Sequence, residues 1–294
     1  MSLWIPAALM ALIVAGLWGP NLMRPPPPAW TLYASVKGQI RRVILADKSV
    51  MRLNGASQAR VVYEDADRRA ALGQAEAAFL MIPSARRPFL ISAGDREVRI
   101  DGGEINVLRQ TTAAGARTIL TIRRGQARIY AQDQSPQQGI GAGPNKEVSW
   151  VDGQPQPSLR TVNADNAFAW ESHHLAYDKA PLADVVADLN RYVARPIRLA
   201  DPSLASLPYS GMLTLEGEDV MLRKNAAVLP IEAKAMPAAI VLQRRLTCPA
   251  KGCPKPVRKK ATGGLVQSLL KLNRPKPKPR PAPHLLPVAR PPTG

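Results

Sequence analysis

Apolar and polar residues alternate in short runs between residues 35 and 162 of the chain. A period of two is typical of strands that bury one face of a sheet. Turn-forming groups separate the runs, among them Asn54-Gly55, Asp101-Gly102-Gly103 and Arg124-Gly125. The pattern predicts an all-β sandwich or wrap, interrupted only by a turn near 69–75. Strands are expected at 36–45, 51–53, 60–63, 78–82, 89–92, 97–100, 105–108, 118–123 and 127–130.

The apolar period changes between residues 163 and 243. A face with helical spacing is formed by Leu182, Val185, Val186, Leu189 and Val193. Pro181 suits the first turn of this helix, and Pro196 is expected to end it. A second, short helix is expected at 218–226, and strands are expected at 175–177, 197–199, 209–215, 228–232 and 239–242. This βαββαβ-like order predicts a small two-layer α+β module.

The N-terminal segment is apolar enough to be a membrane anchor. Residues 3–20 carry no charge, and they just reach the roughly 20 apolar residues that cross a bilayer. We expect an uncleaved anchor over 1–24, although Arg24 mildly opposes an outward C-terminus. The alternatives are a buried helix and a cleaved signal peptide, but no base precedes the apolar run and no small-x-small site follows it. Four prolines then predict a stiff linker over 25–34.

The net charge is concentrated at the C-terminus. The 294 residues include 40 Lys and Arg against 22 Asp and Glu, which gives +18. Residues 244–294 hold 13 of these bases and no acid. Alternating proline and base predicts a disordered tail, which is either simply solvated or contacts an anionic envelope surface. Aromatic residues make up only 5% of the chain and offer few stacking platforms, so we expect no nucleic-acid partner.

Cys248 and Cys253 are the only cysteines, and four residues separate them. This spacing can close a small disulfide loop in an oxidising compartment, with free thiols as the alternative. Zinc would need two further ligands, and no nearby Cys or His supplies them.

No group of residues indicates catalysis. The glycine-rich stretch 139–143 precedes Pro144 and no predicted helix, so it predicts a flexible loop and not a phosphate cradle. His173 and His174 are adjacent, and on a strand they would point to opposite faces and could not readily share a metal. Neither a Gly-x-Ser-x-Gly elbow nor a His-Glu-x-x-His motif occurs. We therefore predict that the protein is not an enzyme and holds no cofactor or metal.

A family resemblance is carried by residues 170–192, which read WESHHLAYDKAPLADVVADLNRY, and by their continuation RPIRLADPSLASLPYSG. Both resemble the C-terminal module of FecR-like transmembrane regulators of extracytoplasmic-function sigma factors. The β-rich domain of that family is resembled by the segments 45–57, 75–79, 85–94 and 103–108. The resemblance covers about residues 35–243.

The resemblance implies a single-pass inner-membrane protein with the bulk of its chain in the periplasm. The FecR-like domain would occupy 35–162, and a module similar to the secretin/TonB short N-terminal domain would occupy 163–243. Such proteins relay a signal from a TonB-dependent outer-membrane receptor toward sigma-factor control, as in the regulation of iron uptake. Only Met1 and Ser2 precede the apolar run, so we expect this chain to lack the family's cytoplasmic anti-sigma domain.

The partners implied are the inner membrane, the signalling domain of the receptor, and a sigma factor if a cytoplasmic segment is missing from this chain. An exposed edge after the predicted helix could accept a strand from the receptor domain. The residues expected to bind the partner are Asn190, Arg191, Tyr192, Arg195 and Arg198. The alternative function is a non-signalling periplasmic scaffold that binds anionic cell-envelope material.

Overall fold

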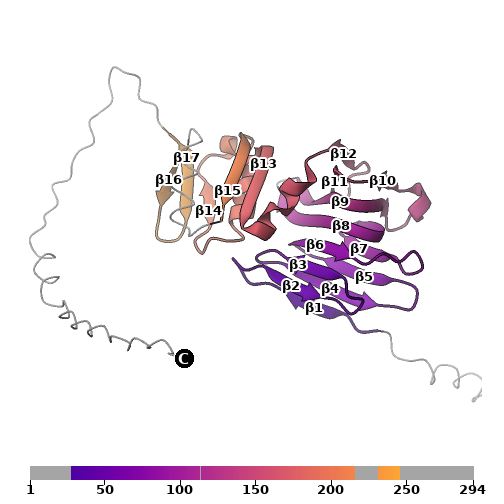
Figure 1. Ribbon diagram of the computed structural model, residues 1–294. Coiled ribbons are helices and arrows are strands. Elements are labelled where there is room, and N and C mark those ends of the chain that lie inside the picture. Colours follow the sequence, from indigo (N-terminus) through magenta and orange to yellow (C-terminus); the bar gives the residue numbers. More distant parts are fainter. Residues whose placement is uncertain (1–27, 113, 216–230, 246–294) are drawn as a thin grey trace, which may run out of the picture. The chain divides into compact units, whose positions relative to one another are not determined.

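The computed structural model describes residues 28–112, 114–215 and 231–245 (Figure 1). These residues fall in one compact unit and are mainly β, with a few short helices. The anchor predicted at 1–24, most of the basic tail at 244–294, and both Cys248 and Cys253 lie outside the described residues. No helix in the described part of the chain is long and apolar enough to cross a membrane.

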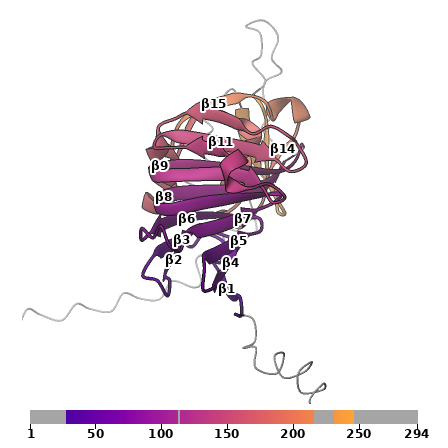
Figure 2. The same cartoon turned by 90° about the vertical axis from the view of Figure 1, so that its right-hand side faces the viewer.

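The first half of the chain forms a 12-stranded sheet. Its main path runs in the order β1-β4-β5-β7-β8-β6-β3-β2, and β9 extends it from β8 to β10, β11 and β12. Neighbouring strands are antiparallel except for the parallel pair β5 and β7. Figures 1 and 2 show the strands lying one above another, from β1 and β2 to β11. The strands are β1 Thr31–Ala34, β2 Arg41–Ile44, β3 Val50–Leu53, β4 Gln58–Tyr63, β5 Arg68–Leu72, β6 Ala75–Met81, β7 Phe89–Ala93, β8 Arg96–Thr112, β9 Gly115–Ala131, β10 Ile140–Ala142, β11 Lys146–Val151 and β12 Ser158–Thr161.

The alternation seen in the sequence separates a buried face from an outer face. Along β8, Ile105 and Val107 enter one hydrophobic core, where they join Phe79 and Phe89, whose rings lie 5.8 Å apart. The predicted strands are confirmed in outline. The turn predicted near 69–75 is confined to Gly73 and Gln74, because the other residues of this range lie in β5 and β6. The strand predicted at 36–45 is confined to β2, and β1 precedes it.

The long hairpin β8–β9 corrects two predicted turns. Asp101-Gly102-Gly103 and Arg124-Gly125 lie inside continuous strands of 17 residues each, at points where the register shifts. Gly103 has φ +133°, and a Cβ there would lie 2.2 Å from the Arg124 carbonyl oxygen. The glycines therefore serve as β-bulges that allow close backbone approach, and the chain does not reverse. The loop predicted at 139–143 is also wrong in part, since β10 pairs there with β9.

The second half of the chain contains two small sheets and a short helix. Strand β13 pairs with β15, and the other sheet has the order β14-β17-β16. The predicted order of strand, helix, strand and strand is confirmed, but the strands divide between two sheets. The helix predicted at 218–226 lies outside the described residues. The elements are the 3₁₀ helix η2 Ala164–Ser172, β13 His174–Pro181, α2 Leu182–Leu189, β14 Ile197–Leu199, the 3₁₀ helix η3 Pro202–Leu204, β15 Pro208–Thr214, β16 Ile231–Ala235 and β17 Ile240–Arg244; a further 3₁₀ turn, η1, spans Pro136–Gln138.

Helix α2 is shorter than predicted. It ends at Leu189, well before Pro196, because the N–H groups of Arg191 and Tyr192 bond to carbonyls three residues back. The predicted apolar face is nevertheless buried as a whole: Leu182, Val185, Val186, Leu189 and Val193 lie in a second hydrophobic core. Ala78 of β6 belongs to this second core, so the core continues onto the outer face of the large sheet.

Candidate functional site

The segment after α2, predicted to bind a partner, lies against the large sheet. The Gly38 amide donates to the Arg191 carbonyl oxygen at 2.9 Å, and the Tyr192 hydroxyl donates to Asn54 Oδ1. A Cβ on Gly55 would lie 2.8 Å from the same Arg191 oxygen, so the approach requires glycine there. Arg191 and Tyr192 therefore connect the two halves of the described chain.

Asn190 covers part of the strand edge that was expected to be open. Its Nδ2 donates to the Ile197 carbonyl at 3.0 Å, and its Oδ1 accepts from the Ile197 amide at 2.7 Å. Pro196 and Ala200 bond to β17, so the intervening backbone groups of Ile197 point away from β17. The Asn190 amide therefore occupies the position that a peptide group of an added strand would take, and the edge of β14 is not open along its whole length.

The remaining two predicted residues lie farther along the same segment. Arg198 is exposed on β14, and Arg195 is half-buried. The structure thus divides the predicted set: Asn190, Arg191 and Tyr192 bond to β14 or to the large sheet, and Arg198 presents its side chain to solvent.

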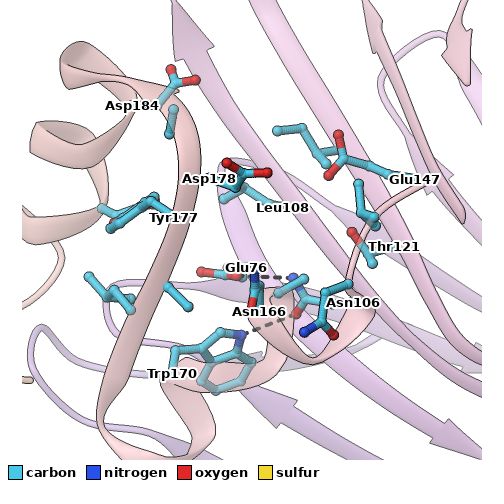
Figure 3. Close-up of a pocket in the computed structure, with 18 of the residues that line it drawn as sticks. Glu76, Asn106, Leu108, Thr121, Glu147, Asn166, Trp170, Tyr177, Asp178 and Asp184 are labelled. Carbon is cyan, nitrogen blue, oxygen red and sulfur yellow. Dashed lines mark hydrogen bonds between the residues drawn. The ribbon is translucent and has the colours of Figure 1, made fainter. Parts of the chain in front are cut away.

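Beneath this segment, a buried hydrogen-bonded chain links the large sheet to η2. The Glu76 carboxylate on β6 is 6% exposed and accepts from Asn54 Nδ2 at 2.7 Å and from Asn106 Nδ2 at 3.0 Å. Asn106 Oδ1 accepts in turn from Trp170 Nε1 at 3.2 Å. Figure 3 shows this relay from Glu76 through Asn106 to Trp170. Buried polar groups of this kind hold their neighbours in one arrangement, since each requires its partner.

A second buried carboxyl, Asp188 on α2, lies beside the first. The Tyr177 hydroxyl donates to Asp188 Oδ2 at 3.0 Å, and Arg191 Nε is 4.0 Å from Asp188 Oδ1. Burial, assisted by the charge of Glu76, raises the pKa of Asp188 to about 7. Burial also raises the pKa of Glu76, against the opposing effects of Arg191 and the two asparagines. One arginine thus faces two carboxyls that resist ionisation.

We expect Asp188→Asn to stabilise the protein at pH 8 by about 1–2 kcal/mol. An unfolded aspartate loses its proton near pH 4, whereas the folded carboxyl keeps it until its pKa of about 7 is reached. Between these values the folded state binds more protons, so stability falls as pH rises, and the loss is complete above the folded pKa. Asparagine cannot ionise, so the gain should shrink toward pH 5. Urea unfolding at both pH values measures it.

The matched control is Asp65→Asn, in the exposed turn between β4 and β5, which should change stability little at either pH. An Asp188→Asn variant that was equally or less stable than the parent at pH 8 would contradict this interpretation.

An ion cluster forms another connection between η2 and the sheet. Glu104 on β8 is 3% exposed and lies 2.9 Å from Arg52, 2.8 Å from Arg124 and 3.5 Å from Arg123. Arg52 also bonds Glu171 of η2 at 2.6 Å. Burial alone would raise the pKa of Glu104, but hydrogen bonds from Arg124 and Arg52 outweigh it and hold that pKa below its ordinary value. Glu104 is therefore ionised at neutral pH, and Arg52 links it to Glu171 on η2.

Between the outer face of the large sheet and β13 lies a cavity of about 330 Å³ (Figure 3). Leu108 and Gln110 of β8 and Glu147 of β11 line the sheet side, and Tyr177 and Asp178 of β13 line the opposite side. Glu76, Asn106 and Trp170 also line it, so the cavity and the buried hydrogen-bonded chain are continuous. Its walls come from both halves of the described chain.

The other residues weighed in the sequence are not brought together. His173 ends η2 with φ +58°, and His174 begins β13. In the described ranges no three His, Cys, Asp or Glu side chains are grouped in a way that could hold a metal ion.

Sequence reasoning missed the polar residues that the second half of the chain covers. Glu76, Asn106, Gln110, Thr121 and Glu147 are all buried. Asn106, Gln110 and Thr121 alternate with core residues along β8 and β9. Polar residues in such a pattern usually lie on the side of a strand that faces solvent. The available signal was that Asn106 and Gln110 carry no charge, although solvent-facing positions commonly do.

One comparison with known families matches much of the first half of the chain. Residues 31–135 match the family described as FecR protein. The chain carries a FecR domain. FecR proteins are regulators of the anti-sigma factor type and catalyse no reaction, so no catalytic residue is expected in the FecR domain.

Solved structures extend the likeness beyond the FecR domain. Two crystal structures of a candidate anti-sigma factor from Parabacteroides distasonis, at 2.50 and 1.65 Å resolution, share the fold with a TM-score of 0.65 each. They are 20% and 19% identical to this chain and cover 74% and 73% of it, and the match spans 99% of each of them. No protein with a curated description matches this chain. The shared fold thus includes residues outside the FecR domain.

Proposed function

We propose that this chain is a membrane-anchored periplasmic regulator of the FecR type, which relays a signal from a TonB-dependent outer-membrane receptor toward sigma-factor control. The FecR domain at residues 31–135 is the observation that carries the proposal. The uncharged segment at residues 3–20 supports a single-pass anchor in the inner membrane. The bulk of the chain would then lie in the periplasm. A sigma factor would be a partner if a cytoplasmic segment is missing from this chain.

The contacts between the FecR domain and residues 163–243 suit a relay. Three bonds cross this boundary. Arg52 pairs with Glu171, the Gly38 amide donates to the Arg191 carbonyl, and Trp170 donates to Asn106. A partner that displaced the segment after α2 would break bonds to the FecR domain directly. Coupling of this kind requires a contiguous set of contacts with two arrangements. The contacts across this boundary would form one of them, and displacement of the segment after α2 would create the other.

We propose that the receptor's signalling domain docks on the outer side of β14, with Arg198 in direct contact. Asn190, Arg191 and Tyr192 would act from within the chain by positioning β14, since their side chains or backbone groups are already bonded. Arg195 lies on the segment between them and would complete the docking surface.

We expect Arg198→Glu to weaken binding of the cognate receptor signalling domain by about tenfold or more, because reversing a contact charge replaces attraction with repulsion. Pull-down and calorimetry with candidate signalling domains, using the full-length chain in detergent, measure this. Arg60→Glu is the matched control, because Arg60 is an exposed strand arginine on β4 of the FecR domain.

Equal binding by the Arg198→Glu and Arg60→Glu variants would reject the docking surface. Failure of every candidate signalling domain to bind would count against the receptor as partner. A reporter that is active only outside the cytoplasm, fused after Gly294, tests the proposed location independently.

The basic tail favours a second candidate function. Its 13 bases and absence of acids suit binding to an anionic envelope polymer, which would make the chain a non-signalling scaffold. Cosedimentation with isolated cell-wall material that is lost on deleting residues 246–294, combined with no receptor binding, would favour this alternative.

A further inference from the structure

The cavity between the sheet and β13 has the size of a small-molecule site. Its volume of about 330 Å³ lies at the lower end of the range of ligand pockets, roughly 300–1,000 Å³. Leu108, Ile119 and Leu175 supply apolar walls. Figure 3 shows Asp178 and Glu147 across the space from one another, with Thr121 beside Glu147.

Two acceptors at this cavity have no donor. Gln110 is 6% exposed, and its Oε1 has no hydrogen-bond partner among the described residues, although its Nε2 lies 3.4 Å from Asp184 Oδ1. Asp178 is exposed at the rim and forms no hydrogen bond or salt bridge within the described part of the chain, although it lies close enough to Arg160 to interact with it electrostatically. A buried acceptor without a donor is costly, so an N–H or O–H group bound in the cavity would be stabilised at Gln110 Oε1.

Most of the charged side chains around the cavity lie close to an opposite charge. The acids that line it are Glu76, Glu147, Asp178, Asp184 and Asp188. The bases that line it are Arg117, Arg160 and Lys179. Arg117 is paired with Asp184 at 3.0 Å and Arg160 with Glu147 at 2.7 Å. Arg191 faces both Glu76 and Asp188, so the Asp178 carboxylate at the rim remains, with the exposed Lys179 next to it in the sequence. The two acceptors, Gln110 Oε1 and the Asp178 carboxylate, favour a ligand that donates N–H groups over an anion.

We propose that this cavity binds a compact organic cation that carries an ammonium or guanidinium group. Gln110 Oε1 and the Asp178 carboxylate receive the N–H donors of that group. The carbon part of the ligand contacts Leu108, Ile119 and Leu175. A bare metal ion fits less well, because no set of three ligating side chains is grouped in the described ranges.

Occupation of this site would strengthen the boundary between the FecR domain and the residues that follow it. Gln110 and Leu108 belong to β8 of the large sheet, whereas Asp178 and Leu175 belong to β13. A ligand that contacts both stabilises the arrangement in which they face each other. The inference concerns a ligand site and does not depend on the receptor contact proposed above.

Isothermal titration calorimetry on the full-length chain in detergent tests the proposal with 1,4-diaminobutane, agmatine and the neutral 1,4-butanediol. We expect at least one of the two amines to bind and the diol not to bind. Asp178→Asn and Gln110→Leu should each weaken amine binding by about tenfold, because each removes a charge-assisted or buried hydrogen bond. Asp65→Asn, an exposed aspartate in the FecR domain, should leave binding unchanged.

A blocked glycine-lysine-glycine peptide forms the second arm of the test. Binding of the free amines assigns the cation to a small molecule, whereas binding of the peptide alone assigns it to a lysine side chain of a protein partner; either outcome supports the site. The proposal is overturned if no amine or peptide binds at about 10 mM, if the diol binds as well as the amines, or if both cavity variants bind like the Asp65→Asn control.

Discussion

Trp170→Ala should lower the free energy of unfolding by about 4–5 kcal/mol. The Trp170 side chain is 2% exposed and packs in the second hydrophobic core, so its loss leaves a large cavity. Its indole N–H also donates to Asn106 Oδ1, which would be left buried without that donor. Urea unfolding followed by circular dichroism measures the change.

Trp30→Ala is the matched control. Trp30 is 45% exposed and precedes β1, so its replacement should cost less than about 1 kcal/mol. If the two tryptophan variants lost similar stability, Trp170 would not hold η2 against the sheet as the structure indicates. If Trp170→Ala kept the full stability of the parent protein, the role of Trp170 in holding η2 against the sheet would also be rejected.

Glu104→Gln should destabilise the protein by about 3 kcal/mol at pH 7, the second largest effect expected. The amide keeps the shape of the side chain but removes the charge that three arginines share, and leaves Arg52, Arg123 and Arg124 facing one another. Partial exposure of these arginines keeps the loss near the lower end of the range for buried ion pairs. Thermal and urea unfolding of parent and variant provide the comparison.

The pH dependence of this difference has a definite sign. The folded pKa of Glu104 lies below its ordinary value of 4.5, so its contribution is fully present above that value. It is lost as pH falls through the lowered folded pKa, where the parent becomes protonated and resembles the glutamine variant. The two proteins should therefore converge in stability at acid pH.

Asp101→Asn tests whether burial is what makes Glu104 important. Asp101 is also on β8 and lies 3.4 Å from Arg99, but both side chains are exposed. Its replacement should cost less than about 0.5 kcal/mol. Equal losses of stability in Asp101→Asn and Glu104→Gln would show that the number of negative charges, and not the buried ion cluster, controls stability.

Local patterns predicted much of the architecture. Strand residues such as 97–100, within β8, follow from alternation alone, because a period of two decides which side chains share a face. The buried face of α2 follows from Leu182, Val185, Val186 and Leu189 in the same way. The family resemblance was predicted from segments of sequence, and residues 31–135 confirm it for the FecR domain.

Local sequence patterns gave wrong predictions where the same residues suit two different backbone conformations. Glycine pairs such as Gly102-Gly103 suit a turn and a β-bulge equally, and only the pairing of β8 with β9 decides between them. The predicted end of α2 is wrong because the sequence pattern ends the helix at Pro196. The hydrogen bond from Asn190 to Ile197 forms only when the chain folds back, so the sequence pattern does not show it.

The β-rich first half, the amphipathic helix and the concentration of charge in the C-terminal segment can be predicted from the amino-acid sequence, because each depends on residues close together in the chain. The burial of Asn106, Gln110 and Thr121 follows from the folded structure, since η2 and β13 cover the outer face of the sheet. The same packing placed Arg191 and Tyr192 against the sheet. Burial depends on what packs against a side chain, and here the packing residues lie far away in sequence.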